Sequence, residues 1–306
     1  MLLIGEAFVT DDEAPTDPIQ RIVASTTMTE RLLLHAATGI VDRFVREPDR
    51  VEVIDHDRRV EPVSQPGRVP AERIDDRHLD SRNPFGLARV GAVLVGGHSE
   101  VTDAVRTPVV AGTMLGIAPG GQFVTTSGAR PDDIVVQVGA VPVEGAAVLA
   151  TEARLRLASV DETFLDAASR ALDEPGISIV DAALLATALG ASAMHDPTEG
   201  GRASGLHELA VASGCSVRVD RRRVQWFQPG RVVCAALGAD PWATLASGCL
   251  LATFPQPVAD AAAVCLAERF DTTVLGRVET GRGVYDETGS EIAWPERDEV
   301  ARILEQ

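Results

Sequence analysis

A carboxylate and a glycine pair stand close together in residues 194–201, which read Met-His-Asp-Pro-Thr-Glu-Gly-Gly. An amphipathic run, residues 203–210, follows directly. The pattern predicts a loop that leads into a helix N-terminus, where backbone N–H groups and the helix dipole favour anions. A carboxylate beside such a site, here Asp196, can hold a metal ion that phosphate groups share. The segment therefore predicts nucleotide or phosphate chemistry, although Asp-Pro-Thr could also serve only as a helix cap or turn.

A second group of polar residues follows an apolar run at residues 91–95. Gly96 and Gly97 let the backbone approach a ligand closely, and His98 and Glu100 alternate along the same face of the segment that follows. Glu100 is a candidate ligand for a divalent metal or a substrate ammonium, and His98 is a candidate proton donor or acceptor. The alternative is a Gly-Gly turn with solvated polar residues.

Four further segments suggest chemistry more weakly. Residues 125–133 favour a turn, with a phosphate contact from Ser127 or Arg130 as the minority interpretation. Residues 247–249, Ser-Gly-Cys, favour a strand-entry turn over a nucleophile. The run Arg221–Arg223 is typical of a solvated face, and Glu144 is placed to complement the dipole of the helix that it opens.

Composition excludes several classes of function. The 306-residue chain has 28 basic and 45 acidic residues, a net charge of −17. This charge argues against general binding to nucleic acid or anionic membranes, because phosphate contacts need a basic face. All the basic residues are arginine, so a mechanism that needs a lysine amine is excluded.

The cysteines and the chain start indicate a cytoplasmic protein. Cys215, Cys234, Cys249 and Cys265 are too widely spaced for a zinc motif, and each lies in an apolar run, which favours buried free thiols. The first residues lack the basic and apolar regions of a signal peptide, and no run of 18 apolar residues occurs.

The first part of the chain differs from the rest. Residues 28–45 have helical apolar spacing, whereas 49–82 are dense in Asp and Arg and predict an exposed or disordered linker that proteases would cut. We therefore expect a helical N-terminal segment at 1–48, a charged linker at 49–83, the remainder of an N-terminal domain at 84–127 and a C-terminal domain at 128–306.

Strands and helices alternate after residue 85, which places the chain in the α/β or α+β class. The expected strands are residues 91–95, 108–116, 134–138, 216–220, 250–254 and 273–278. The expected helices are residues 143–153, 164–172, 179–189, a helix through residue 210, 232–237 and 258–269.

Six motifs together resemble the superfamily of aminoimidazole ribonucleotide synthetase, selenophosphate synthetase, thiamine-monophosphate kinase and the hydrogenase-maturation carbamoyl dehydratase. The likeness is greatest to the hydrogenase-maturation branch and its synthetase-related cousins. The matching segments are residues 96–102, 129–136, 143–150, 195–201, 206–210 and 247–252. Their order and spacing match the family from about residue 88 to 290.

The resemblance implies a two-domain synthetase-like fold whose C-terminal α/β domain has a mixed sheet flanked by helices, and whose N-terminal domain is here atypical. It also implies a homodimer that binds ATP and Mg²⁺ between the domains and activates a small acceptor by phosphorylation. The resemblance further implies that Glu100 and Asp196 are metal ligands. It implies catalytic roles for His98, Glu100 and Asp196. The ATP-binding residues would be Gly96, Gly97, Asp196, Thr198, Gly200 and Gly201.

The sequence also departs from the family pattern. Only residues 11–14, Asp-Asp-Glu-Ala, are faintly similar to the N-terminal Asp-Asp motif that supplies Mg²⁺ ligands. The end, Ala301 to Gln306, lacks the cysteine that the hydrogenase-maturation enzyme carbamoylates, and the lysine of selenophosphate synthetase has no counterpart. Two hypotheses follow: an ATP-dependent synthetase or kinase-like enzyme, or a catalytically weakened relative that serves as a nucleotide-binding or scaffold subunit.

Overall fold

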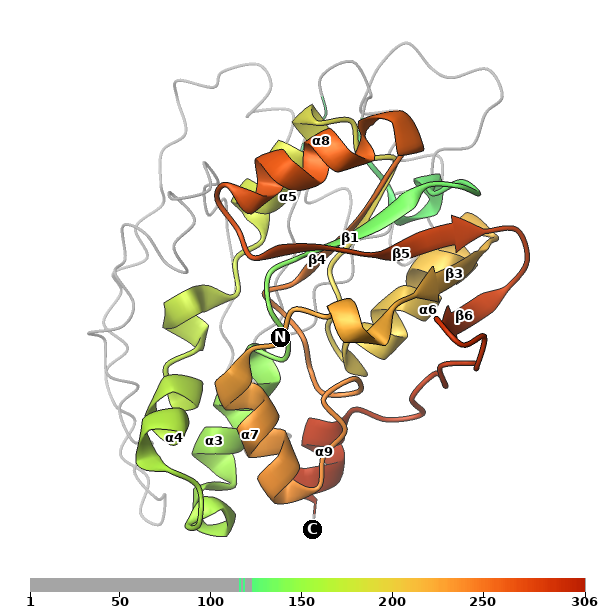
Figure 1. Cartoon of the computed structure of the whole chain (residues 1–306). Coiled ribbons are helices and arrows are strands. Elements are labelled where there is room, and N and C mark those ends of the chain that lie inside the picture. Colours follow the sequence, from blue (N-terminus) through green and yellow to red (C-terminus); the bar gives the residue numbers. More distant parts are fainter. Residues whose placement is uncertain (1–115, 117, 119–122, 306) are drawn as a thin grey trace, which may run out of the picture. The chain divides into compact units, whose positions relative to one another are not determined.

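The computed structural model describes residues 116, 118 and 123–305 (Figure 1). Contacts divide the chain into two units, Met1–Ile117 and Ala118–Gln306. The structure described below is that of the second unit. The expected helix at 28–45, the linker at 49–83 and the strands at 91–95 and 108–116 lie outside the described residues, apart from Gly116.

A six-stranded mixed sheet forms the centre of this unit. Its order is β2-β4-β1-β5-β3-β6, and every neighbouring pair is antiparallel except β3 and β6, which run parallel. The strands are β1 (Ile134–Val138), β2 (Ala193–His195), β3 (Ser216–Val219), β4 (Leu250–Phe254), β5 (Thr272–Glu279) and β6 (Gly283–Asp286). The mixed sheet with helices confirms the expected architecture of the C-terminal domain.

Helices cover both faces of the sheet. The α-helices are α3 (Glu144–Glu152), α4 (Glu162–Ser169), α5 (Val180–Ala188), α6 (Gly201–Ser213), α7 (Gln228–Leu237), α8 (Gln256–Ala267) and α9 (Glu299–Leu304). Short 3₁₀ turns lie at Thr126–Gly128, Arg154–Leu157 and Arg221–Arg223, and a π-helical turn at Leu172–Gly176. In Figure 1, α5 and α8 lie together on one side of the strands. No helix in the described part of the chain is long and apolar enough to span a membrane.

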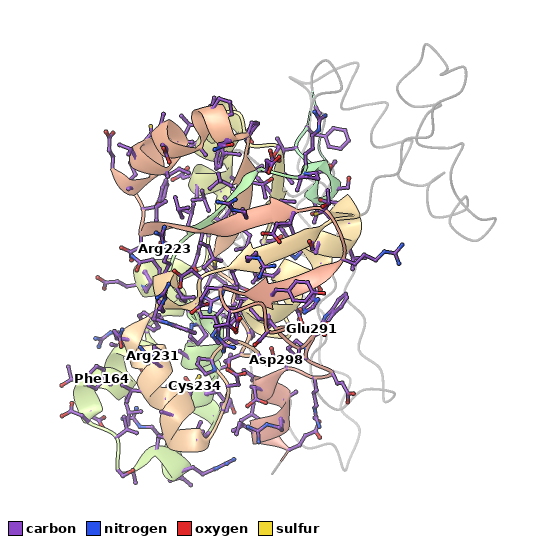
Figure 2. The ribbon with its side chains drawn as sticks, turned by 45° about the vertical axis from the view of Figure 1, so that its right-hand side comes forward. Phe164, Arg223, Arg231, Cys234, Glu291 and Asp298 are labelled. Carbon is purple, nitrogen blue, oxygen red and sulfur yellow. The ribbon has the colours of Figure 1, made fainter. Side chains whose placement is uncertain are left out.

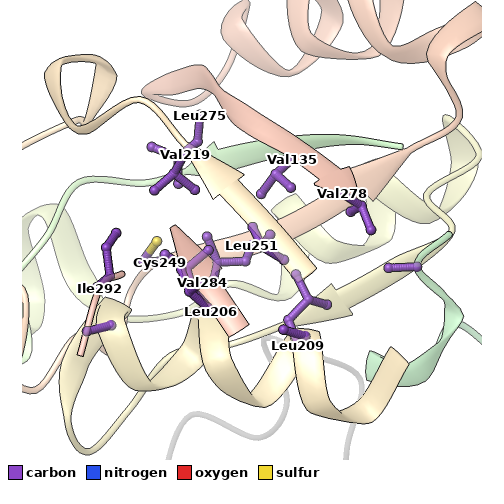
Figure 3. Close-up of a cluster of buried hydrophobic side chains, with 14 of the residues drawn as sticks. Val135, Leu206, Leu209, Val219, Cys249, Leu251, Leu275, Val278, Val284 and Ile292 are labelled. Atoms are coloured by element: carbon purple, nitrogen blue, oxygen red, sulfur yellow. The ribbon is translucent and has the colours of Figure 1, made fainter. Parts of the chain in front are cut away.

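Alternation along the central strands divides the core between the two faces. Val135 and Leu251 pack in the same cluster as Leu206 and Leu209 of α6, as Figure 3 shows. Val136, Val138, Leu250, Ala252 and Phe254 instead pack against α5 and α8. All five residues of β4 are buried, which is typical of a strand covered on both sides.

A separate group of helices packs beyond one edge of the sheet. Buried residues of α3, α4, α7 and α9 form one apolar cluster, in which Leu149, Leu165, Val233 and Ile303 are almost fully buried. The sequence predicted α3, α4 and α7, although α7 begins four residues earlier than expected, but it did not predict α9.

Candidate functional site

Three loops gather at one end of the strands, which we call the loop edge of the sheet. Because β1 and β2 both run antiparallel to β4, the C-terminal ends of β1 and β2 lie beside the start of β4. Residues 139–143, 196–200 and 245–249 therefore meet there. The amide of Ala246 donates to the carbonyl oxygen of Thr198 at 3.2 Å, which ties two of these loops together. Polar groups of the motif at 194–201 are thus held on a rigid sheet.

The glycine pair forms the turn that starts α6. Gly200 and Gly201 have φ angles of 74° and 64°, in the left-handed region that favours glycine. A Cβ on Gly201 would lie 2.6 Å from the carbonyl oxygens of Trp242 and Thr244. The pair is therefore needed both for its backbone conformation and for the close approach of the segment at 242–244.

The first amides of α6 have acceptors within the protein. The Gly200 amide donates to the Asp298 carboxylate at 2.7 Å, and the Ala203 amide donates to the Trp242 carbonyl oxygen at 2.9 Å. Asp298, labelled in Figure 2, also caps α9 by accepting from the Val300 amide. Burial raises the pKa of Asp298 above its usual range. Contact of Gly200 and Gly201 with a ligand stays a prediction, because these contacts show only their structural role.

The carboxylate of Asp196 is exposed at the end of β2. It follows the last residue of β2, its side chain is exposed, and within the described residues it makes no hydrogen bond or ion pair. Glu199, three residues on, is also exposed. Within residues 123–305 no three His, Cys, Asp or Glu side chains are placed to hold a metal ion. Mg²⁺ usually binds one or two carboxylates together with phosphates, so Asp196 fits as a partial ligand set.

A histidine–glutamate pair lies next to Asp196. The Nε2 atom of His195 is 2.7 Å from a carboxylate oxygen of Glu208, and its Nδ1 atom is 3.5 Å from the Thr126 hydroxyl. The pair joins β2 to α6 and fixes the orientation of the imidazole. No local signal in the sequence pairs His195 with Glu208, which lies thirteen positions away, and this contact was not predicted. A hydrogen-bonded His–Glu pair can hold or transfer a proton.

Arg202 is buried beneath these loops. Its side chain is fully excluded from solvent. The guanidinium lies 4.0 Å from the ring centroid of Trp242 and 4.6 Å from that of Trp226. The two indoles are 76° apart and so form a corner around it. Burial lowers the pKa of Arg202 to about 9, so the group is charged at neutral pH.

Among the described residues, the guanidinium of Arg202 makes one hydrogen bond, and its partner is the side chain of Gln137. Nη1 donates to the side-chain oxygen Oε1 of Gln137 at 3.2 Å, whereas Nε and Nη2 have no partner among the described residues. Gln137 is held by its own bonds to the carbonyl oxygens of Gly139 and Gln225. Nothing in the sequence distinguished Arg202 from a surface arginine.

Comparison with known proteins gives the family. A family model described as "AIR synthase related protein, C-terminal domain" matches residues 130–287, about half of the chain. The chain belongs to this family. The match confirms the resemblance inferred from the six motifs.

Relatives of this AIR synthase-related chain include hydrogenase-maturation proteins. Carbamoyl dehydratase HypE of Rhodobacter capsulatus is 29% identical over 175 residues, 57% of this chain and 48% of that protein. A crystal structure of HypE in complex with ATP shares 20% identity, with a TM-score of 0.43, over 59% of this chain and 55% of the other. Thiamine monophosphate kinase of Aquifex aeolicus shares 26% identity, with a TM-score of 0.42, over 56% and 55%. The chain spans about half the length of the curated relatives it matches.

The structure describes only some of the remaining candidates of this AIR synthase-related chain. Gly96, Gly97, His98 and Glu100 lie outside the described residues. Ser127 and Arg130 are exposed in the expected turn, where the Arg130 amide donates to Asp133.

Cys249 is a structural residue. It is fully buried, and burial raises the pKa of its thiol to about 12, which keeps it protonated. Ser247 and Gly248 form the expected turn before β4. In the run Arg221–Arg223 all three residues are exposed, and Arg222 and Arg223 both pair with Asp220, as expected for a solvated face.

Proposed function

We propose that this AIR synthase-related protein binds ATP with Mg²⁺ at the loop edge of its sheet and transfers a phosphoryl group to a small acceptor. The observation that carries the proposal is the exposed Asp196 carboxylate, which has no partner in the described structure and lies in a family motif at the end of β2. Oxygen ligands of this kind suit Mg²⁺ bound to phosphates. When bound, the metal would neutralise charge on the transferred group.

The proposal extends to residues that the structure does not describe. Glu100 would share the metal with Asp196, His98 would lie near the acceptor, and Gly96 and Gly97 would contact the nucleotide. Thr198, Gly200 and Gly201 would shape the loop beside the phosphates. We further propose that the protein is a homodimer, as the family resemblance implies, and that it is cytoplasmic.

Calorimetric titration of the full chain with ATP tests this function. With Mg²⁺ present, the wild type should bind ATP, and Asp196→Asn should weaken binding by about tenfold or more because a charged metal ligand is lost. In EDTA the two proteins should bind equally, since Asp196 acts through the metal. Absence of binding heat at millimolar nucleotide would refute ATP binding.

A matched control separates the role of Asp196 from a loss of surface charge. Asp260 is an exposed carboxylate on α8, which covers the sheet face opposite α6. Asp260→Asn should bind ATP as the wild type does. Equal affinity of Asp196→Asn and the wild type in Mg²⁺ would remove Asp196 from the site. Binding without release of ADP in the presence of any acceptor tried would favour a catalytically weakened nucleotide-binding or scaffold protein.

A further inference from the structure

Two hydrogen-bond donors of Arg202 that have no acceptor in the described residues lie on one edge of its guanidinium. Nε–H and one N–H of Nη2 point in parallel from the side opposite Nη1, and this is the edge that binds two oxygens of one carboxylate or similar oxyanion. In Arg202 both of these atoms are buried and lack a partner in the described part of the chain, whereas Nη1 donates to the side-chain oxygen of Gln137. A single bidentate acceptor would satisfy both.

Among the residues that the structure describes, the charge of Arg202 also lacks a counter-ion. No carboxylate of the described residues lies within 4.0 Å of it, and the fully buried Cys249 thiol is protonated at neutral pH. A buried cation without a counter-ion is destabilising. The two indoles offset part of this cost, but they supply no acceptor in the plane of the guanidinium.

A path to Arg202 is marked by Trp242. The indole of Trp242 contacts the Arg202 guanidinium and also lines a surface pocket of about 400 Å³. Arg221 lines the same pocket, and its guanidinium lies 4.6 Å from the centroid of the Trp242 ring. Two positive groups therefore contact this indole, one exposed and one buried. Arg297 and four acidic residues, Asp240, Glu291, Glu296 and Glu299, also line this pocket. Movement of the Trp242 indole would connect the pocket to Arg202.

We infer that Arg202, Gln137, Trp226 and Trp242 form a buried binding site for a small oxyanion of the carboxylate type. The ligand would accept two parallel hydrogen bonds from Nε and Nη2 and would neutralise the guanidinium. Close packing by the two indoles and the neighbouring core restricts the ligand to a few heavy atoms, such as formate, acetate or bicarbonate. This site is distinct from the phosphate-side role proposed for Asp196 and does not depend on it.

Thermal unfolding of the full chain in formate tests the site. Chloride is replaced by formate at constant pH and ionic strength, so that screening does not change. Binding to the native state should raise the midpoint with the logarithm of the formate concentration above the dissociation constant, by about 3–5 °C at ten times that constant. Arg202→Met keeps the length of the side chain and removes the charge and the donors, so its midpoint should not respond to formate.

Two further variants make the test specific. Arg223→Met removes an equally charged but exposed arginine and should respond as the wild type does. Arg202→Lys keeps a positive charge but lacks the parallel donors, so it should lose more than half of the formate shift. Equal formate shifts in the wild type and Arg202→Met, or no shift in the wild type, would overturn the proposal, and the latter would indicate water at the guanidinium edge.

A measurement on the wild type alone covers the case in which Arg202→Met does not fold. The NMR line of ¹³C-labelled formate should broaden on addition of protein and should sharpen when nitrate, a planar oxyanion of similar size, competes for the site. Tryptophan fluorescence should change over the same formate concentrations, because two of the three tryptophans form the corner around Arg202. A formate line that stays narrow at millimolar ligand would overturn the proposal.

Discussion

Burial sets the reactivity of the cysteine side chains. Burial raises the pKa of Cys249 to about 12 and that of Cys234 to about 11, and it also raises the pKa of Cys215. A raised pKa keeps a thiol protonated, and the protonated form is a poor nucleophile. Cys265 on α8 differs because its side chain is half-buried.

We expect one thiol to react with a disulfide reagent at pH 8 and three to be protected. Cys265 should react within minutes, whereas Cys215, Cys234 and Cys249 should react only when denaturant unfolds the chain. The absorbance of the released thiolate measures both phases. Cys265→Ser should abolish the fast phase. A fast phase of more than one thiol per chain, or its persistence in Cys265→Ser, would show that the described packing is open in solution.

Side-chain partners far apart in the sequence limit prediction at this scale. The sequence predicted a solvated Arg221–Arg223 run and four buried thiols, of which all but Cys265 are buried, because each depends on local composition. It did not predict that His195 contacts Glu208 or that Arg202 lies between two indoles, because these contacts follow from the docking of α6 on the sheet. A single arginine in an amphipathic run has no local signal of burial.

Helix α6 begins and ends next to glycines that have nearly the same φ angle but different surroundings. Gly201 at its start has φ 64°, and Gly214 just after its end has φ 63°. A Cβ on Gly201 would lie 2.6 Å from two carbonyl oxygens, whereas a Cβ on Gly214 would meet nothing within 4 Å. The two positions therefore separate backbone strain from steric contact.

Alanine substitution at these glycines should have unequal effects on stability. Gly214→Ala should cost about 1 kcal/mol, the strain of a left-handed residue with a Cβ. Gly201→Ala should cost about 3 kcal/mol or more, since the segment at 242–244 must also move. Urea unfolding measures both free energies. Equal costs would show that the close approach of α6 to Trp242 and Thr244 is absent in solution.

The length of an element decides whether its sequence reveals it. Strands β1 and β4 and helices α3 and α8 were predicted near their observed bounds, because each has enough residues for an apolar pattern to repeat. Strand β2 has three residues, and it was taken as part of the loop that carries Asp196. Strand β6 and helix α9 have four and six residues and were not predicted. Their places depend on pairing with β3 and on packing with α3.

The described unit combines a three-layer core with a group of helices. Its order of strands cannot be derived from local patterns, because sequence-distant strands pair: β1 lies between β4 and β5, and β3 pairs with both β5 and β6. The mixed sheet was nevertheless predicted, since the family resemblance implied it. The family match ends at residue 287, before α9 begins, so the resemblance gave no account of this last helix.

The second unit should fold without the first. The apolar clusters of the described residues all lie within residues 129–303. We expect a fragment of residues 118–306 to unfold cooperatively, with a midpoint within about 5 °C of the transition that the same residues show in the full chain. Circular dichroism during heating and the dispersion of amide NMR signals measure this. A broad transition with dye-binding apolar surface would contradict the prediction.

A shorter fragment tests what α9 contributes to the family-matched part. Residues 118–287 keep the whole sheet but lose Val300 and Ile303, which pack into the cluster of α3, α4 and α7. They also lose Asp298, the acceptor for the Gly200 amide at the start of α6. The fragment also lacks Ile292, which packs in the cluster with Leu206 and Leu209. The burial of three aliphatic side chains and one cap amounts to about 5–10 kcal/mol, so this fragment should be unfolded or far less stable than 118–306. Equal urea midpoints would show that α9 is not docked and that Gly200 is held by the loop alone.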